Sequence, residues 1–317
     1  MDHPHVEPLS RFLHSAAWEA HLVHDYPLVH RDSQTDTLFT QILLPLKGSF
    51  WRGSRIPVPE NWKLPDLPGN PWFIRIQPDT LAAEQTLRKT FKGRLRTVKR
   101  SIQPPQTVAI DLQKAQLEIL EEMHQKHRYN IKVAQKAGLT IRIVSSHFIE
   151  EFDTLWNLIE KTSSHHEIRS FERPHYESIV QSLQSDHMVH LAFASTADGT
   201  PVAGALLIRC GDVLTYLHGG SDYEQRALMA PYLLHWGIIE WAKAENLKTY
   251  DLWGVNTRDG KPIAHHPSYG TSRFKLGFGG TLVHYPRSYD IILKPFWYSL
   301  YRLGQFFRRT PASFNDH

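Results

Sequence analysis

Lys275 is the residue whose type and position point most directly to chemistry. It follows Arg273 and Phe274 in a segment with glycines at positions 270, 277, 279 and 280. Glycine lets backbone and side chains approach a bound molecule closely, and a fixed ammonium group there can stabilise an oxyanion that develops during a reaction. A surface lysine beside a structural phenylalanine is the competing interpretation, and the residues taken alone favour it.

A second concentration of charge lies between residues 88 and 100. This stretch contains no acid and seven cations, Arg88, Lys89, Lys92, Arg94, Arg96, Lys99 and Arg100. Such a run attracts phosphate, whether on a nucleic acid, a nucleotide sugar or an anionic lipid surface. A solvated helix face is the plainer alternative. The net charge of +4 is only mildly basic, so the uneven placement of the charge is more informative than its sum.

The sequence gives little support for a metal site, a disulfide or a membrane-spanning helix. Cys210 is the single cysteine, which excludes an internal disulfide and a cysteine zinc cluster. The histidine pairs at 165–166 and 265–266 are adjacent, and adjacent side chains point in different directions on a helix, so we predict no metal site. No apolar stretch is long enough to span a membrane, and the acidic first residues are unlike a secretory signal. We therefore expect a cytoplasmic protein.

The elements that would position these residues are mixed helices and strands. At 317 residues the chain is long for one core, and two domains are expected. A helix is predicted over residues 117–137, with Gly138 as its C-cap. Farther along, the pattern predicts an antiparallel meander, then a helix, then a strand. Their ranges are 189–193, 202–208 and 213–217 for the meander, 231–244 for the helix and 249–253 for the strand.

The carboxy-terminal segment 291–309 has apolar residues at helical spacing. They are Leu293, Phe296, Trp297, Leu300, Leu303 and Phe307, and Arg302, Arg308 and Arg309 flank them. As a basic amphipathic helix the segment could lie on a membrane surface. Core packing is the commoner use of such a stripe, and we expect it here.

Six motifs, in order along the chain, resemble the Fem family, the FemX, FemA and FemB aminoacyltransferases that build peptidoglycan cross-bridges. They occupy residues 12–18 (FLHSAAW), 76–78 (IQP), 123–138 (MHQKHRYNIKVAQKAG), 216–221 (YLHGGS) continuing at 229–236 (MAPYLLHW), 250–254 (YDLWG) and 270–280 (GTSRFKLGFGG). The likeness covers nearly the whole chain and is strongest after residue 107. The order of meander, helix and strand is also that of the GNAT acyltransferase fold.

The resemblance implies an α+β fold of two tandem GNAT-like domains. Domain 1 would comprise residues 1–143 plus 288–317, and domain 2 residues 144–287. Some members carry a long coiled-coil insertion, for which this chain has no room. The compact, FemX-like form is therefore expected.

The implied activity is transfer of an amino acid from aminoacyl-tRNA to the stem peptide of a peptidoglycan precursor, either lipid II or UDP-MurNAc-pentapeptide, which forms the interpeptide bridge. The ester arrives activated, so the enzyme must position and neutralise an amine and stabilise the oxyanion. No cofactor is expected besides aminoacyl-tRNA as co-substrate. The expected partners are this tRNA, the precursor and, peripherally, the inner face of the membrane.

The resemblance also implies roles at the reacting ester. Phe274 would pack against the acceptor end of the tRNA, and Lys275 would stabilise the tetrahedral intermediate. Asp111, at the end of a predicted strand, is a candidate proton acceptor, although an acid in that position is more commonly structural.

Five further residues are expected to bind substrate. Arg173 and Tyr176 match the family segment that grips precursor phosphate, for which arginine offers a planar donor fork; an ordinary helix start with proline at its first turn is the alternative. Tyr216 and His218 would share one strand face, because side chains alternate, and would line the stem-peptide groove. Arg52 belongs to a loop that reads Arg-Gly-Pro in the family and Arg-Gly-Ser here.

Two other functions remain open. A coenzyme A-dependent GNAT N-acyltransferase needs glycine where the loop meets the pyrophosphate, and Leu228 occupies that place. A non-catalytic tRNA-binding protein would use the basic run at 88–100. Members that act on the soluble precursor carry a lysine where this chain has Leu22, so the sequence leaves the form of the acceptor undecided.

Overall fold

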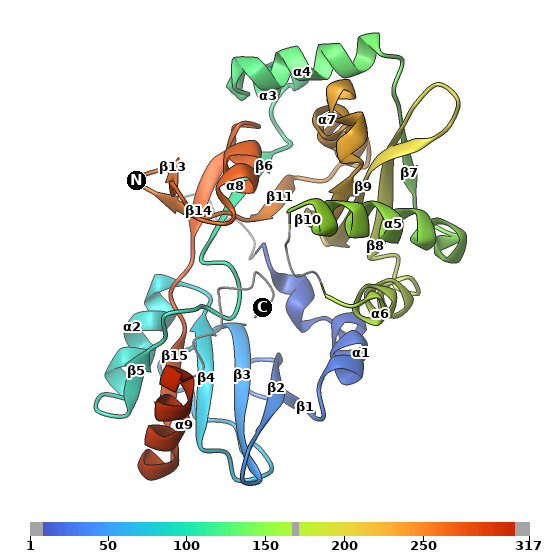
Figure 1. The fold of residues 1–317 in the computed structure, drawn as a ribbon. Helices are drawn as coiled ribbons and strands as arrows, with labels where there is room; N and C mark the ends of the chain where they lie inside the picture. The colour runs from blue at the N-terminus through green and yellow to red at the C-terminus, as the bar shows by residue number, and fades with distance from the viewer. Residues whose placement is uncertain (1–8, 167–170, 308–317) are drawn as a thin grey trace. The chain divides into compact units, whose positions relative to one another are not determined.

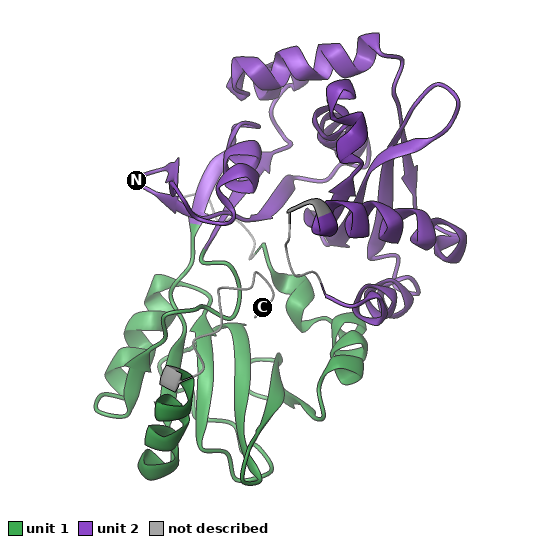
Figure 2. Cartoon of the chain, viewed as in Figure 1, with its two compact units in different colours: residues 1–105, 284–317 green, residues 106–283 purple. Residues whose placement is uncertain are grey.

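The computed structural model describes residues 9–166 and 171–307, which form an α+β fold (Figure 1). The chain divides into two compact units (Figure 2): unit 1 comprises residues 1–105 and 284–317, and unit 2 residues 106–283. Each unit has its own mixed β-sheet with helices packed against it. The expected α+β class is confirmed.

Unit 1 is built on a six-stranded sheet in the order β1-β2-β3-β4-β15-β5. Its strands are β1 (Val29–Asp32), β2 (Thr37–Leu44), β3 (Gly48–Ile56), β4 (Phe73–Pro78), β5 (Leu95–Thr97) and β15 (Tyr289–Ile292). β15 pairs antiparallel with both β4 and β5. The sheet is therefore completed only when the chain returns after the last residue of unit 2.

Helices cover both faces of the unit 1 sheet. They are α1 (Ala16–Asp25), α2 (Leu81–Thr90) and α9 (Pro295–Phe307), with the 3-10 turn η1 (Arg11–His14) before α1. Successive side chains of β4 point to opposite faces. Ile74 and Ile76 belong to the core that contains Leu87 of α2, whereas the Phe73 ring lies 5.2 Å from the Tyr298 ring of α9.

Helix α9 is only partly packed into the core. Trp297 stacks on Trp72 with ring centroids 4.9 Å apart, which confirms core packing for this part of the stripe. Phe296, Leu300 and Leu303, at spacings of four and three residues, form a neighbouring face that is 68%, 40% and 54% exposed. Residues 308 and 309 of the expected helix lie outside the described residues. Within residues 9–166 and 171–307, no helix is both long and apolar enough to cross a membrane.

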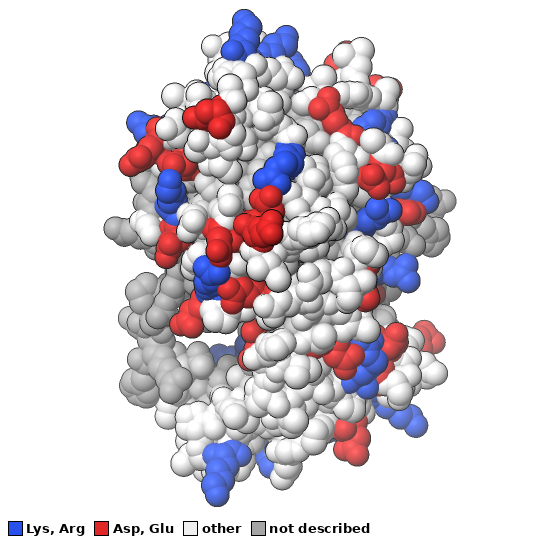
Figure 3. All heavy atoms as spheres, turned by 90° about the vertical axis from the view of Figure 1, so that its right-hand side faces the viewer, with Lys and Arg blue, Asp and Glu red and all other residues white. Residues whose placement is uncertain are grey.

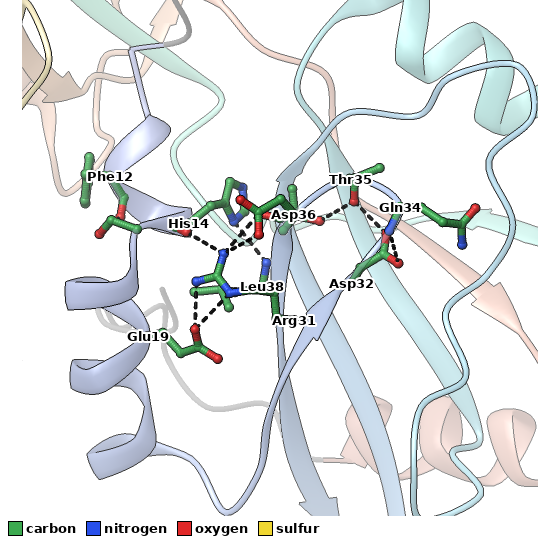
Figure 4. A network of polar contacts seen from close by, with 11 residues as sticks. Phe12, His14, Glu19, Arg31, Asp32, Gln34, Thr35, Asp36 and Leu38 are labelled. Carbon is green, nitrogen blue, oxygen red and sulfur yellow. Dashed lines mark hydrogen bonds and ion pairs between the residues drawn. The ribbon is translucent and has the colours of Figure 1, made fainter.

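Arg31 ties α1 to the first hairpin of unit 1 (Figure 4). Its guanidinium donates to the Glu19 carboxylate at 2.9 and 2.7 Å, to the Asp36 carboxylate at 2.8 Å and to the His14 carbonyl at 3.0 Å. The His14 ring accepts the Leu38 N–H at 3.1 Å, and burial lowers the pKa of His14 to about 4. One side chain thus holds η1, α1 and the β1–β2 turn together.

Unit 2 is built on a seven-stranded sheet in the order β14-β6-β11-β10-β9-β8-β7. Its strands are β6 (Gln106–Asp111), β7 (Thr140–Val144), β8 (Val189–Ser195), β9 (Pro201–Cys210), β10 (Val213–Ser221), β11 (Thr249–Gly254) and β14 (Thr281–His284). β8, β9 and β10 form an antiparallel meander, and β10 is parallel to β11 after a helical crossover. The predicted succession of meander, helix and strand is confirmed. β12 (Thr257–Arg258) and β13 (Lys261–Pro262) form a separate hairpin.

Helices lie on both faces of the unit 2 sheet. They are α3 (Gln116–Glu122), α4 (Gln125–Lys136), α5 (Phe148–His166), α6 (Arg173–Leu183), α7 (Ala230–Ala244) and α8 (Tyr269–Leu276), with the 3-10 turn η2 (Tyr223–Leu228). α7 packs on β8 and β9, and α4 packs on α7; Leu207 and Leu214 face this side. α5 packs on β9 and β10 from the other side, where Leu155 faces Gly204.

The unit boundary differs from the expected domain boundary at residues 143–144. Residues 106–143 belong to unit 2, because β6 pairs with β11 and α4 packs on α7. The predicted single helix over 117–137 is also divided. Met123 is extended (ψ 144°) and ends α3, and the His124 ring accepts the Lys126 N–H at 3.1 Å to begin α4. A new N-cap, rather than glycine or proline, therefore separates the two helices.

Candidate active site

The candidate site lies in unit 2, where the parallel strands β10 and β11 cease to pair. Their shared register ends at Thr215 opposite Asp251. Just beyond it, each strand has a β-bulge in its other pairing, between Tyr216 and His218 on β10 and between Asp251 and Gly254 on β11. Bulges bend a strand and redirect its side chains. Beyond this last pair, β10 and β11 no longer pair with each other.

Lys275, from α8, lies between these two strand ends. Its Nζ donates to the Gly254 carbonyl oxygen of β11 at 3.1 Å and lies 5.4 Å from the centroid of the Tyr216 ring of β10. The residue is 6% exposed. Burial lowers the pKa of Lys275 to about 8, and the Asp251 carboxylate opposes this shift. Because burial disfavours the charged form, the positioned Lys275 ammonium is present at neutral pH and is lost as the pH rises through about 8.

Asp251 supplies the negative charge of the site, and sequence reasoning missed it. It is completely buried; its carboxylate accepts the Trp253 N–H at 2.9 Å and the Thr107 hydroxyl of β6. Trp253 has φ of 57°, a left-handed conformation that is unusual for a bulky residue and that clusters at functional sites. A signal was present in the sequence, since an aspartate inside the apolar strand 249–253 is uncommon unless it is paired.

Phe274 belongs to an aromatic cluster beneath Lys275. Its ring lies 5.1 Å from Tyr232 and 5.3 Å from His235, both on α7. His127 of α4 hydrogen-bonds the Phe274 carbonyl oxygen through Nε2 at 2.8 Å. Burial, and then the charge of Lys275, lowers the pKa of His235 to about 3, and its Nδ1 lies 2.9 Å from the Tyr250 hydroxyl. His235 is therefore neutral and polarises no substrate by charge.

The glycines around Lys275 have a structural use that the sequence did not indicate. A Cβ on Gly277 would lie 2.0 Å from the His127 ring, and one on Gly280 would lie 2.5 Å from the Ala109 carbonyl oxygen. The lack of a side chain at Gly277 and Gly280 lets the end of α8 and the residues that follow pack closely on His127 and Ala109. The close approach that we expected to a ligand is made to the protein itself. Gly270 alone of the four has nothing near its Cβ position.

Tyr216 and His218 do not share a face, contrary to the prediction. Tyr216 pairs with Leu207 and packs on His235 of α7, with ring centroids 4.6 Å apart. His218 pairs with Leu206 and packs on Tyr176 of α6, at 4.8 Å. The bulge between them inserts one residue, which reverses the alternation of side chains.

The pair expected to grip phosphate is placed differently for each member. Tyr176 is buried, and burial raises its pKa to about 12, so its hydroxyl remains a neutral donor. Arg173 is exposed at the start of α6, where it donates to Asp153 at 2.5 Å and to Glu177 at 2.7 Å. Pro174 follows it at the helix start, which matches the structural alternative. An incoming phosphate would have to compete with both carboxylates.

Asp111 and Arg52 are not brought to Lys275 within unit 2. Asp111 is exposed at the far end of β6 and accepts the Gln113 N–H at 2.9 Å. Thr107, the residue of β6 that reaches Asp251, is four residues away, or about 13 Å along a strand. Arg52 lies on β3 of unit 1 and donates to the Tyr26 hydroxyl at 2.5 Å. The structure thus unites Lys275, Phe274 and Tyr216, adds Asp251, and leaves Asp111 apart.

Comparison with known proteins identifies the family of the chain. A model described as the FemAB family matches residues 85–199 and 193–305. A protein of Staphylococcus haemolyticus named lipid II:glycine glycyltransferase is 28% identical over 37% of the chain and 27% of its own length. The protein of the same name from Staphylococcus aureus is 29% identical over 32% of the chain and 24% of its length. The chain thus spans about a quarter of the length of these relatives.

Solved structures show the same fold over nearly the whole chain. The crystal structure of FemX superposes with a TM-score of 0.76 and 17% identity, covering 95% of this chain and 99% of that one. The carboxy-terminal domain of a putative lysylphosphatidylglycerol synthetase from Agrobacterium fabrum has a TM-score of 0.58 and 15% identity, covering 90% of each chain. The expected compact, FemX-like fold is confirmed.

Proposed function

The chain belongs to the FemAB family, and from this premise we propose that it is an aminoacyltransferase of peptidoglycan synthesis. It would transfer an amino acid from aminoacyl-tRNA to the stem peptide of a precursor and so form the interpeptide bridge. The observation that carries the proposal is the buried ammonium of Lys275 at the divergence of β10 and β11. The names of the relatives, lipid II:glycine glycyltransferase, support a cell-wall acceptor.

In this reaction the protein must position the two substrates and stabilise the negative charge that develops on the ester oxygen. The acceptor amine attacks the ester carbonyl carbon, a C–N bond forms, and the carbonyl oxygen becomes an oxyanion. The C–O bond to the tRNA ribose then breaks, and the amine proton ends on the departing ribose oxygen. An ammonium held in place before the reaction stabilises the oxyanion without reorganisation. Lys275 fits this role, because Gly254 and the Tyr216 ring fix its position.

Tyr176 and His218 extend the proposal to the acceptor. Their rings are packed together beside β10, and the neutral Tyr176 hydroxyl can donate to a phosphate or peptide oxygen. The exposed Arg173 can add a donor fork if the acceptor displaces its two carboxylates. The proposal leaves the proton transfer to the substrates, since Asp111 lies apart from Lys275.

A lipid-linked acceptor would bring the protein to the inner face of the membrane. The exposed face of α9, with Phe296, Leu300 and Leu303, offers apolar side chains for peripheral contact, and Arg302 lies beside them. Aromatic and aliphatic residues flanked by cations are typical of helices at a lipid interface. Soluble UDP-MurNAc-pentapeptide is the other acceptor form to be compared.

The test is transfer of radiolabelled amino acid from charged tRNA to lipid II or UDP-MurNAc-pentapeptide by the full chain. Lys275→Met should lower turnover by about 10²- to 10³-fold, the usual effect of losing an oxyanion donor, with precursor binding retained. Lys136→Met, which removes an exposed lysine of the same unit, is the control and should leave turnover unchanged. Full turnover in Lys275→Met excludes the role of Lys275. Failure of every charged tRNA, with transfer from an acyl-coenzyme A instead, would overturn the proposed function.

A further inference from the structure

The basic run at residues 88–100 is largely exposed on unit 1. It covers the last turn of α2, the turn that follows and the edge strand β5, which pairs on one side only, with β15. We define the basic surface by its exposed cations Lys89, Lys92, Arg94, Arg96 and Lys99. Leu95 packs into the core with α2, so its neighbours Arg94 and Arg96 point away from that core.

The charge of this surface is not compensated locally. Residues 85–110 contain no aspartate or glutamate. In the part of the chain that the structure describes, Lys89, Lys92, Arg94 and Lys99 form no ion pair, whereas Arg88 at the inner edge pairs with Glu84. An unpaired set of cations this dense raises the local positive potential and attracts polyanions.

Several exposed cations elsewhere in the molecule are paired with acids. In unit 2, Arg142 pairs with Glu151, Lys161 with Asp222 and Arg173 with Asp153. On the face seen in Figure 3, blue and red atoms adjoin in several places. In each of these pairs an acid balances the exposed cation, whereas Lys89, Lys92, Arg94 and Lys99 have no such partner among the described residues. The density of these cations on one short segment favours an anionic partner.

The partner is better matched by RNA than by a membrane. Among the described residues, no large exposed hydrophobic side chain occurs between Leu81 and Leu117, and Phe91 is half-buried, with its ring 6.2 Å from Trp62. A surface that binds lipid combines cations with apolar residues that insert. A surface that binds a folded RNA needs mainly phosphate contacts.

We infer that the basic surface of α2 and β5 binds the phosphate backbone of the tRNA that carries the amino acid. The inference rests on the proposed function for the identity of the RNA, but the surface, its charge and its location on unit 1 are independent of that function. It assigns binding of the tRNA body to unit 1, whereas the Lys275 site is built in unit 2.

The experiment measures binding of uncharged bulk tRNA to the full chain over a series of salt concentrations. The variant Lys92→Gln/Arg94→Gln/Lys99→Gln removes three cations of the basic surface. The matched control, Lys126→Gln/Lys132→Gln/Lys136→Gln, removes three exposed lysines from α4 of unit 2, so both variants change the net charge equally. Thermal unfolding of each variant verifies that the fold is retained.

We expect the first variant to bind tRNA about 10- to 100-fold more weakly near 0.1 M salt. The slope of log K against log salt should fall in magnitude by about 2 to 3, since each lost phosphate contact contributes roughly 0.7 to 0.9. The α4 variant should keep the affinity and slope of the unchanged chain. In transfer assays, the first variant should have a raised KM for aminoacyl-tRNA and an unaltered kcat.

Four results would overturn the inference. Equal weakening by both variants would mean that only net charge matters. Unchanged tRNA binding in the first variant, with transfer still active, would show that this surface does not bind tRNA, and it would leave the proposed function intact. Loss of binding to phosphatidylglycerol vesicles, but not to tRNA, would reassign the surface to a membrane. If the unchanged chain binds no tRNA and transfers no amino acid from it, the proposed function fails as well.

Discussion

The ammonium of Lys275 is held 3.1 Å from the carbonyl oxygen of Gly254, at the end of the β11 bulge. A backbone carbonyl is a neutral acceptor, so it orients the cation without cancelling its charge. The negative charge that acts on Lys275 is that of the Asp251 carboxylate. This carboxylate is buried and accepts hydrogen bonds from Thr107 and Trp253. The site therefore keeps a net ability to stabilise a negative charge that arrives with the substrate.

The first prediction concerns the alkaline limb of the reaction. The pKa of Lys275 lies at about 8, below its ordinary value, because the residue is buried. The ammonium is thus present below pH 8 and is lost as the pH rises through it. We expect kcat/KM to fall above about pH 8, and we expect Lys275→Arg, which keeps its charge at all accessible pH values, to lose that limb even if its activity is lower. An unchanged alkaline limb in Lys275→Arg would assign the titration to another group.

The second prediction concerns Asp251. Asp251→Asn keeps an oxygen that can accept from Trp253 and Thr107, but it removes the negative charge that raises the pKa of Lys275. That pKa should therefore fall, and the alkaline limb of kcat/KM should move to lower pH. The control is Asp111→Asn, an exposed acid of the same unit, which should leave the limb in place. A large loss of turnover in Asp111→Asn at every pH would instead restore Asp111 as the proton acceptor.

The sequence patterns identified which segments contribute to this site, but not how the side chains of those segments are arranged. The motifs at 250–254 and 270–280 contain Asp251, Gly254, Phe274 and Lys275, which the structure brings together. Periodicity also predicted the meander and the crossover helix, because alternation and apolar spacing are local properties. Local pattern thus sufficed wherever the element was regular.

What could not be predicted depends on contacts between distant segments. The bulge that separates Tyr216 from His218 is defined only by pairing with β9, and no residue type marks it in the sequence. Arg173 appeared available for phosphate until the structure placed Asp153, twenty residues earlier, at its guanidinium. The predicted helix over 117–137 was divided at His124, which caps a new helix and whose N–H donates to the distant Gly277 carbonyl oxygen at 2.9 Å. Each error came from reading a residue without its tertiary partner.

The third prediction tests the structural use of the glycines. In Gly277→Ala the new methyl group would lie 2.0 Å from the His127 ring, which cannot move away without breaking its hydrogen bond to the Phe274 carbonyl. We expect a loss of about 2 to 3 kcal/mol in the free energy of unfolding, as for other overpacked positions. Gly270→Ala, inside α8 with open space around the position, should be neutral or stabilising by up to about 1 kcal/mol. Urea unfolding measures both, and equal stabilities would refute the packing argument.

The fourth prediction follows from His235, whose pKa burial lowers to about 3. The unfolded chain binds a proton at this imidazole near pH 6.5, whereas the folded chain does not until far lower pH. The stability from keeping His235 neutral is thus fully present above pH 6.5 and declines as the pH falls toward 3. In His235→Gln the fall in the free energy of unfolding between pH 6 and 4 should be shallower by up to about 1.4 kcal/mol per pH unit, even though the variant is less stable at pH 7 because the contact with Tyr250 is altered. Urea unfolding across this range measures the slope, with His24→Gln, an exposed histidine of α1, as the matched control. Parallel curves for His235→Gln and the unchanged chain would show that the imidazole is already protonated in the folded protein.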